Sequence, residues 1–236
     1  MEGQQPAGMD AVTAALFPDS FENSPLGEIP KGWILSTIGE SVRVVGGSTP
    51  STKEPAYWEG GTIYWITPKD LASLSSPVVV DTERRITELG LQQISSRLLP
   101  KGTVLLSSRA PIGYLAIAEV PLAINQGFIA MICDHKLSNH YVLQWTRVNM
   151  DAIKGRANGT TFLEISKTNF RPLNIVVSSP KILQIFTKQA ADLHQQIVSN
   201  LEQSQILATI RDTLLPKLMS GEIRVKEANK LVEAVA

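Results

Sequence analysis

Several residues that can form directional hydrogen bonds with nucleic-acid bases occur in segments that the sequence predicts as loops between strands. In the major groove of DNA, arginine and lysine can pair with guanine, and asparagine and glutamine can pair with adenine. The chemistry available to these side chains is therefore recognition of base edges. The candidates for base contacts are Lys69, Arg109, Asn125, Gln126, Arg156 and Asn158.

A second set of side chains in the same loops suits phosphate oxygens, which position a protein on DNA without reading its sequence. These candidates are Ser107, Ser108, Lys154, Thr160, Thr161 and Lys167. The residues Ser107–Arg109 and Asn125–Gln126 are equally consistent with a structural role in their turns. Arg156 and Asn158 are the favoured base contacts, because Lys154–Thr161 is predicted to be a flexible, basic loop rich in hydrogen-bonding groups.

No arrangement of side chains indicates catalysis or a bound metal. Cys133, His135 and His140 lack the paired spacing of a zinc site. There is no glycine fingerprint for a dinucleotide, no Walker-type phosphate loop and no Gly-x-Ser-x-Gly turn. Gly46–Pro50 has the glycines of a phosphate-binding nest but no Gly-Lys-Ser/Thr motif, so it is interpreted as a structural turn. The chain is expected to bind rather than to catalyse, with no metal and no cofactor of its own.

The composition is that of an ordinary globular protein whose charge is unevenly distributed. The 236 residues have a formal net charge of zero, a hydrophobic content of 43% and a single cysteine. Residues 1–30 carry acidic but no basic side chains, whereas residues 136–171 carry a basic excess. A basic face and a solvated surface fit that excess equally well. A lone cysteine and the lack of a long apolar run predict a cytoplasmic location without membrane association.

The elements that must position these loops indicate an α+β domain with mixed or antiparallel strands over residues 26–178. β-Branched and aromatic runs predict strands at 41–45, 62–67, 103–107, 113–118, 128–133 and 173–177. Helices are predicted after Thr87, to about residue 97, and after Ser138, since both hydroxyl groups suit N-caps. The aromatic residues of Tyr57–Trp65 are assigned to the core rather than to a base-stacking surface. Residues 1–25 are interpreted as a flexible acidic leader and residues 220–236 as a C-terminal tail.

Residues 179–219 are predicted to form one long helix. It begins at Ser179-Pro180, which supplies an N-cap and a first residue without a backbone N–H. At Pro216 the helix is expected to kink or stop. An imperfect heptad seam indicates a coiled-coil-type helix that pairs with a second helix, and the alternative is a helix folded back on its own domain. The seam residues assigned to dimerisation are Phe186, Leu193, Ile197, Asn200, Leu207, Leu214 and Leu218.

Six ordered segments carry a resemblance to a known family. They are 26–33 (LGEIPKGW), 46–50 (GGSTP), 63–71 (IYWITPKDL), 105–113 (LLSSRAPIG), 123–128 (AINQGF) and 214–223 (LLPKLMSGEI). As an ordered set they resemble the specificity (S, or HsdS) subunit of type I restriction-modification systems. The resemblance implies a non-catalytic DNA-recognition subunit in which a target recognition domain precedes a long conserved helix. It does not single out base-reading residues, since these differ between members.

The resemblance also implies partners. Methyltransferase (M) subunits would dock on the chain and restriction (R) subunits would join them, with S-adenosylmethionine on the former and ATP and magnesium on the latter. A complete S subunit has two recognition domains and two helices, whereas this chain has one of each. It is therefore expected to be a half-subunit that forms a homodimer through the helix, or a fragment of a longer subunit. A symmetric dimer would recognise an interrupted palindrome in double-stranded DNA, with Asn200 fixing the helix register.

A coiled-coil adaptor whose globular head binds protein is the alternative from a different class. The basic excess at residues 136–171 favours DNA over a protein partner, and the salt dependence of binding would separate the two. A stand-alone methyltransferase is not favoured, because 236 residues that are mostly assigned to other elements leave no room for a cofactor-binding domain.

Overall fold

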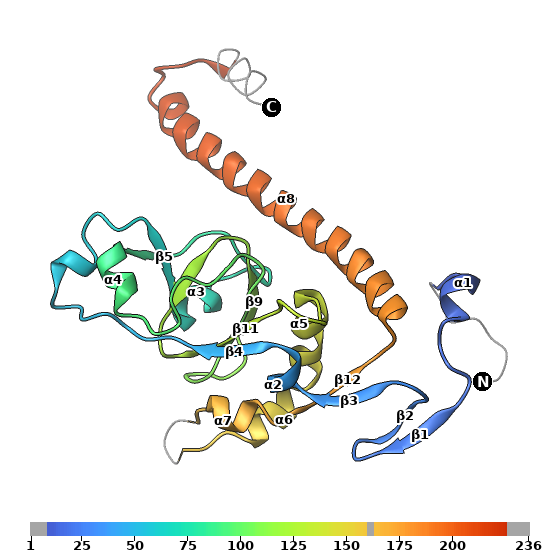
Figure 1. The fold of residues 1–236 in the computed structure, drawn as a ribbon. Helices are drawn as coiled ribbons and strands as arrows, with labels where there is room; N and C mark the ends of the chain where they lie inside the picture. The colour runs from blue at the N-terminus through green and yellow to red at the C-terminus, as the bar shows by residue number, and fades with distance from the viewer. Residues whose placement is uncertain (1–8, 160–162, 226–236) are drawn as a thin grey trace. The chain divides into compact units, whose positions relative to one another are not determined.

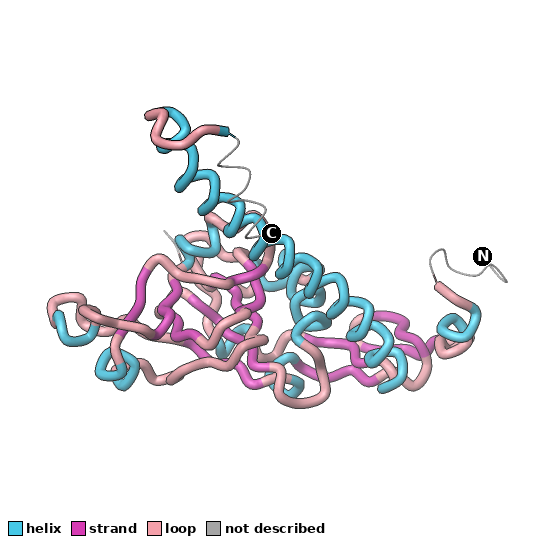
Figure 2. Tube along the Cα trace, turned by 90° about the horizontal axis from the view of Figure 1, so that it is seen from above, coloured by secondary structure: helices cyan, strands magenta, loops and turns pink. Residues whose placement is uncertain are grey.

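The computed structural model describes residues 9–159 and 163–225, and the chain divides into two compact units, residues 1–190 and 191–236. All strands of the described residues belong to the first unit, and most of the long C-terminal helix belongs to the second (Figures 1 and 2). The fold is α+β with mixed and antiparallel sheets, as the sequence predicts.

A five-stranded sheet in the order β4-β11-β8-β9-β6 forms the centre of the first unit. Its strands are β4 (Arg43–Gly46), β6 (Val78–Val79), β8 (Val104–Ser107), β9 (Leu115–Ala118) and β11 (Phe128–Ile132). Strand β11 pairs antiparallel with both β4 and β8, and β8 pairs antiparallel with β9. Strand β6 pairs parallel with β9. The β8–β9 pair confirms the predicted hairpin.

Both faces of this sheet are covered, because every residue of β8 and β11 is buried. Successive side chains of a strand point to opposite faces. Accordingly, Leu106 and Ile129 belong to one hydrophobic cluster, whereas Leu105 and Ala130 belong to another. The continuous apolar run Phe128–Ile132 is what a strand buried on both sides requires. The ends of these strands are therefore held by packing on two sides.

One face of the sheet packs against three helices, and the other against a second sheet. The helices are α5 (Asn139–Val148), α6 (Met150–Gly155) and α7 (Lys167–Phe170). The second sheet has the order β10-β5-β7 and consists of β10 (Leu122–Ile124), β5 (Ile63–Ile66) and β7 (Arg84–Ile86). Strand β5 is parallel to β10 and antiparallel to β7. Short helices α3 (Pro68–Ala72), α4 (Glu88–Gln92) and the 3-10 turn η1 (Pro55–Tyr57) lie along this part of the chain.

The predicted N-caps are confirmed, but one helix is shorter than expected. The Ser138 hydroxyl accepts a hydrogen bond from the Tyr141 N–H, and the Thr87 hydroxyl accepts one from the Gly90 N–H. Helix α4 ends at Gln92 rather than near residue 97. Arg97 has a φ of 59°, a left-handed conformation that a right-handed helix cannot contain.

The start of the chain is more ordered than the leader that the sequence predicts. It contains α1 (Ala11–Ala14) and an antiparallel hairpin of β1 (Phe21–Ser24) and β2 (Gly27–Pro30). The boundary predicted at residue 25 therefore falls inside a hairpin, whose turn uses the left-handed φ of 94° at Gly27. Strand β3 (Ile34–Thr37), followed by α2 (Ile38–Ser41), pairs antiparallel with β12 (Asn174–Val177). Strands from near the two ends of the first unit thus lie together.

Helix α8 (Pro180–Met219) is 40 residues long, which corresponds to about 60 Å, and is drawn as one uninterrupted helix (Figure 1). The expectation that it would stop at Pro216 is wrong. Pro216 lies in the last turn, so the one hydrogen bond that it cannot donate, to the Asp212 carbonyl, is lost only near the end of the helix. The helix begins one residue after the predicted start at residue 179, and its part up to Ala190 belongs to the first compact unit, where Ile182 is buried.

Candidate nucleic-acid interface

The candidate loops gather at one end of the five-stranded and three-stranded sheets. Because β11 is antiparallel to β4 and β8, its first residue Phe128 pairs with Ser107, and the next residue pairs with Gly46. In the second sheet, Ile124 pairs with Ile66 where β10 and β5 both end. The segments attached to these strand ends form a group that we term the loop rim, residues 46–51, 67–70, 108–114 and 125–127.

Close backbone contacts hold the first rim segment against its neighbour. The Ser48 N–H donates to the Ile124 carbonyl at 3.2 Å. A Cβ atom at Gly47 would lie 1.9 Å from the same carbonyl oxygen, so only glycine permits this approach. The Ser48 hydroxyl donates to the Gln93 carbonyl. Gly46–Pro50 is therefore a structural turn, as the sequence analysis predicts.

Ser107 closes the turn between β8 and β9 from the inside. It is 0% exposed, and its hydroxyl oxygen accepts hydrogen bonds from the N–H groups of Gly113 (3.1 Å) and Tyr114 (2.8 Å). The same hydroxyl donates to the Pro111 carbonyl at 2.8 Å. Because this side chain is buried and its hydrogen-bonding capacity is used within the turn, the structure favours the structural role that the sequence analysis left open over a phosphate contact.

Ser108 is also buried, which again favours a structural role over a phosphate contact. Its backbone joins two loops. The Ser108 N–H donates to the Gly127 carbonyl at 2.8 Å, and the Ser108 carbonyl accepts from the Ile165 N–H at 3.0 Å. The chain between α6 and α7 is thereby attached to the loop rim.

Arg109 remains at the surface of the rim. Its guanidinium lies 3.5 Å from the Glu164 carboxylate, and both side chains are partly exposed. The two residues also form an isolated β-bridge. Glu164 therefore holds the arginine side chain near the rim and neutralises part of its charge. An exposed ion pair of this kind contributes only about 0–1 kcal/mol, so a DNA group can replace the carboxylate at small cost.

The loop between α6 and α7 is anchored at both described ends. Asn158 and Glu164 exchange two backbone hydrogen bonds of 2.9 Å each. The Asn169 side chain donates to the Arg156 carbonyl at 3.0 Å. The side chains of Arg156 and Asn158 are exposed. Thr160 and Thr161, the other candidates here, lie outside the described residues.

Two candidate lysines lie against the rim. Lys154, in the last turn of α6, has its Cε atom 3.7 Å from the Cβ position at Gly113. Lys167, the first residue of α7, has its ammonium nitrogen 3.4 Å from the Cβ position at Gly46. Both lysines are exposed. The structure thus brings the basic candidates of the α6–α7 region to the same end of the domain as Arg109.

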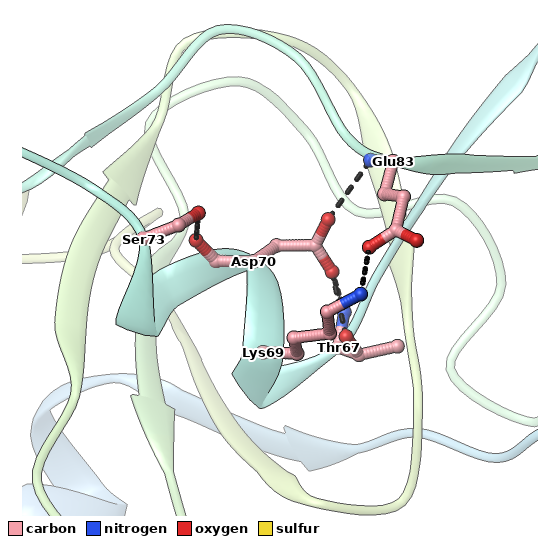
Figure 3. Close-up of polar contacts among 5 residues, drawn as sticks. All are labelled: Thr67, Lys69, Asp70, Ser73 and Glu83. Carbon is pink, nitrogen blue, oxygen red and sulfur yellow. Dashed lines mark hydrogen bonds and ion pairs between the residues drawn. The ribbon is translucent and has the colours of Figure 1, made fainter.

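Lys69 lies in the first turn of α3, where its ammonium is 2.7 Å from the Glu83 carboxylate (Figure 3). The hydrogen bond from this ammonium to Glu83 raises the pKa of Lys69 above its usual value. Asp70 fixes the position of both partners. Its carboxylate accepts hydrogen bonds from the Thr67 N–H (2.8 Å), the Thr67 hydroxyl (2.6 Å) and the Glu83 N–H (2.8 Å). Lys69 remains a candidate whose charge is shared with Glu83.

The two amide candidates, Asn125 and Gln126, differ in how available their side chains are for a base contact. The Asn125 side-chain oxygen accepts a hydrogen bond from the Gly127 N–H at 2.8 Å and so shapes its own turn. Pairing with adenine uses both atoms of an amide, so a base contact by Asn125 would share the oxygen that holds this turn. Gln126 is exposed and accepts a hydrogen bond from the Thr49 hydroxyl, which can rotate away. Gln126 is the more accessible of the two.

Sequence reasoning overlooked Arg84. Its guanidinium carbon lies 3.7 Å from the ring centroid of Trp58 and 5.4 Å from that of Trp65. The assignment of the aromatic run to the core is right for Trp65, which is 3% exposed, but Trp58 is only half-buried. The sequence signal that could have indicated a basic site here was the pair Arg84-Arg85 at the start of a strand. The antiparallel pairing with β5, which brings it to the aromatic residues, is not visible in sequence.

Among residues 9–159 and 163–225, no group of three or more His, Cys, Asp and Glu side chains could hold a metal ion. Burial raises the pKa of the Cys133 thiol to about 12, so the thiolate that a metal needs is disfavoured. That the chain carries no metal or cofactor stays a prediction. In the same parts of the chain, no helix has the length and apolarity that a membrane span requires.

One residue assigned to the helix seam packs on its own domain. The Phe186 ring meets the Tyr141 ring edge to face, with centroids 5.8 Å apart. The Thr187 hydroxyl donates to the Ser138 hydroxyl at 2.9 Å. Both contacts lie within the first unit. The ring of the half-buried Phe186 therefore helps to attach the start of α8 to the first unit, and its dimerisation role stays a prediction.

In the second unit the seam presents apolar side chains to solvent. Leu193 is 70% exposed and Leu207 is 62% exposed, and Ile197 is also exposed. The remaining apolar seam positions, Leu214 and Leu218, are half-buried. The exposed Asn200 lies between these apolar positions, and its side-chain oxygen accepts a hydrogen bond from the Gln196 amide at 3.0 Å. The heptad spacing therefore coincides with an apolar strip along this part of α8.

Comparison with known proteins bears on both units. The family model described as the type I restriction modification DNA specificity domain matches residues 30–210. The specificity subunit of the type I restriction enzyme MjaIX from Methanocaldococcus jannaschii is 40% identical over 192 residues, 80% of this chain and 44% of that protein. The HindI specificity subunit from Haemophilus influenzae is 25% identical over 201 residues, 83% of this chain and 42% of that protein.

The fold is shared with a solved structure, the HsdS subunit from Thermoanaerobacter tengcongensis. The TM-score is 0.55 at 21% sequence identity, and the match covers 89% of this chain and 49% of that one. The chain thus spans less than half the length of the relatives it matches. Since the family model covers most of the residues and a relative is 40% identical over 80% of them, the chain belongs to the family of type I restriction modification DNA specificity domains.

Proposed function

We propose that this chain is a non-catalytic, sequence-specific DNA-binding subunit, or half of one, that gives a type I restriction-modification complex its target. The observation that carries the proposal is the convergence of candidate side chains on one end of a firmly packed sheet. Arg109, Lys154, Arg156, Asn158 and Lys167 come from separate segments and surround the same loop rim. A DNA duplex lying across this rim would meet all of them.

The side chains divide into base readers and phosphate contacts. Arg156 and Asn158 are exposed on an anchored backbone, which suits base readout in the major groove. Lys154 and Lys167 are single point charges at the margin of the rim, which suits phosphate oxygens. The ion pair of Arg109 with Glu164 holds an arginine in place for DNA without neutralising it strongly.

The second unit supports a role in assembly. The exposed strip of Leu193, Ile197 and Leu207 follows the heptad spacing of a helix that packs against another helix. A second copy of this chain would cover the strip and bring a second loop rim, with Asn200 fixing the register. Two identical rims related by two-fold symmetry would recognise an interrupted palindrome. The M and R subunits would supply catalysis, with S-adenosylmethionine on M and with ATP and magnesium on R.

The test starts from the purified chain together with a type I methyltransferase subunit. Selection from a library of random double-stranded DNA is expected to enrich one short motif, and light scattering is expected to give the mass of two copies of the chain. Enrichment of two motifs in inverted order with a fixed spacer supports the dimer. Binding that selects no motif and does not weaken with added salt contradicts the proposal and favours a protein-binding adaptor.

A further inference from the structure

The guanidinium of Arg84 is held on an aromatic platform whose rings are themselves fixed. It lies 3.7 Å from the Trp58 centroid, and the Trp58 and Trp65 rings meet edge to face at 5.0 Å. Each indole N–H donates to the backbone of the first rim segment, Trp58 to the Ser51 carbonyl at 2.9 Å and Trp65 to the Ser48 carbonyl at 3.4 Å. Aromatic faces attract a cation, so the stack orients the arginine side chain before any ligand arrives.

The positive charge of Arg84 has no carboxylate partner in the described parts of the chain. The acidic side chains next to it are occupied, since Asp81 lies 3.2 Å from Arg85 and Glu83 lies 2.7 Å from Lys69. Within residues 9–159 and 163–225, Arg84 is exposed and takes part in no ion pair. A guanidinium that stacks on a ring keeps its N–H donors in the plane of the group, directed away from the ring.

The backbone places Arg84 at the same end of the domain as the loop rim. It is the first residue of β7 and pairs with Trp65, next to the last residue of β5. The preceding residue, Glu83, contacts Lys69 and Asp70 of rim segment 67–70 (Figure 3). The Thr82 hydroxyl donates to the Arg84 carbonyl at 2.7 Å and fixes the turn that leads into the strand. Arg84 therefore lies beside the rim.

We infer that Arg84 binds a phosphate of the DNA backbone and that Trp58 is its positioning residue. This inference rests on the proposed function. A planar fork of N–H donors matches phosphate oxygens, and the stack reduces the rotamer freedom that binding would otherwise remove. A phosphate is the favoured ligand because Arg84 is an exposed strand residue held over Trp58 beside the rim, and not a residue of a loop tip that could enter a groove. The contact adds affinity equally for all sequences.

The test measures binding of the full chain to several unrelated mixed-sequence duplexes over a range of salt concentrations. Arg84→Gln is expected to weaken binding to every duplex by about tenfold and to reduce the slope of log K against log salt by about 1. Arg84→Lys keeps the charge and is expected to retain most of the slope. Trp58→Leu is expected to weaken binding while leaving the slope unchanged, because the positive charge of Arg84 remains but its guanidinium is no longer positioned by the Trp58 ring.

Arg85→Gln is the matched control, since it makes the same charge change on the next residue, whose guanidinium already has the partner Asp81. Equal losses of DNA affinity in Arg84→Gln and Arg85→Gln would show that only the overall positive charge matters, and would overturn the inference. Salt-dependent binding by wild type with no change in Arg84→Gln would overturn the inference and leave the proposed function intact. A wild-type chain without salt-dependent DNA binding would overturn both. Melting temperatures of all variants separate loss of contact from loss of folding.

Discussion

The Ser107 hydroxyl oxygen accepts a hydrogen bond from the Tyr114 backbone N–H at 2.8 Å, across the turn between β8 and β9. This bond turns a side chain that looks available for a ligand into an internal clamp. The clamp determines the path of the backbone over residues 108–113 and therefore the point from which the Arg109 side chain extends. A polar residue in a candidate binding loop can therefore act on recognition through shape alone.

Replacement of Ser107 by alanine is expected to lower the free energy of unfolding by about 1–3 kcal/mol, because it leaves the buried N–H groups of Gly113 and Tyr114 without this acceptor. Urea denaturation followed by circular dichroism measures the change. The exposed Ser95 provides a control, and Ser95→Ala should change stability by less than about 0.5 kcal/mol. Loss of DNA binding by Ser107→Ala at unchanged stability would contradict the clamp role.

Asp70→Ala is expected to destabilise the domain by about 2–3 kcal/mol, because one carboxylate caps α3 and also holds the Glu83 backbone. Glu83→Ala removes only an exposed ion pair with Lys69, so its expected effect is about 0–1 kcal/mol. Thermal or urea unfolding of the two variants side by side measures the difference. Equal losses of stability would show that the Lys69–Glu83 ion pair, rather than the hydrogen bonds of Asp70, stabilises the start of α3.

Arg156→Ala is expected to relax the selected DNA motif at one or two positions, with a loss of about 1–3 kcal/mol for the preferred base there. Selection from a random DNA library before and after the substitution measures the change. Arg97→Ala is a suitable control, since Arg97 is exposed and lies beside the start of β10, at the end opposite the loop rim. An unchanged motif in Arg156→Ala would remove the α6–α7 loop from the reading surface.

Leu207→Arg is expected to reduce the solution mass from two copies to one, because it places a charge in the apolar strip of α8. The expected stability of the first unit is unchanged, since the position belongs to the second unit. Thr209→Arg introduces the same charge two residues away, on the helix face opposite the seam, and should leave the mass unchanged. A dimer that survives Leu207→Arg would rule out this strip as the contact between copies.

Cys133 is expected to react slowly with maleimide at pH 8 in the native chain and rapidly in denaturant, because burial raises the pKa of its thiol to about 12 from an ordinary value of 9.0. Only the unfolded state releases this proton between those values, so the stabilising contribution is present below pH 9 and is lost as the pH rises toward 12. Mass spectrometry of the labelled chain follows the reaction. Fast native labelling at pH 8 would contradict the burial.

Much of the fold is predictable from local pattern. The apolar run Phe128–Ile132 and the hairpin around Pro111 could be read directly, because burial on both faces and turn chemistry leave clear signals. The same holds for the start of α8 at Pro180. The β1–β2 hairpin was missed because its strands expose most of their side chains and so lack the alternation that burial imposes. A strand without a buried face looks like a linker.

The site was less predictable, because the residue type shows what a side chain can bind but not whether it is free to bind. Ser107 and Arg156 both occur in polar loops, yet only the structure shows that the first is buried and the second exposed. Arg84 became visible only through the pairing of β7 with β5, which joins distant parts of the chain. Contacts that depend on long-range strand pairing leave no local signal in sequence.

The central strands, buried on both sides, have a consequence for how such a domain can change its target. The points at which each loop leaves the sheet are set by interior packing and do not depend on the residues at the loop tips. Exposed side chains on these loops, such as Gln126 and Arg156, can therefore be varied without rebuilding the scaffold, whereas Gly47 and Ser107 hold the loops themselves and cannot.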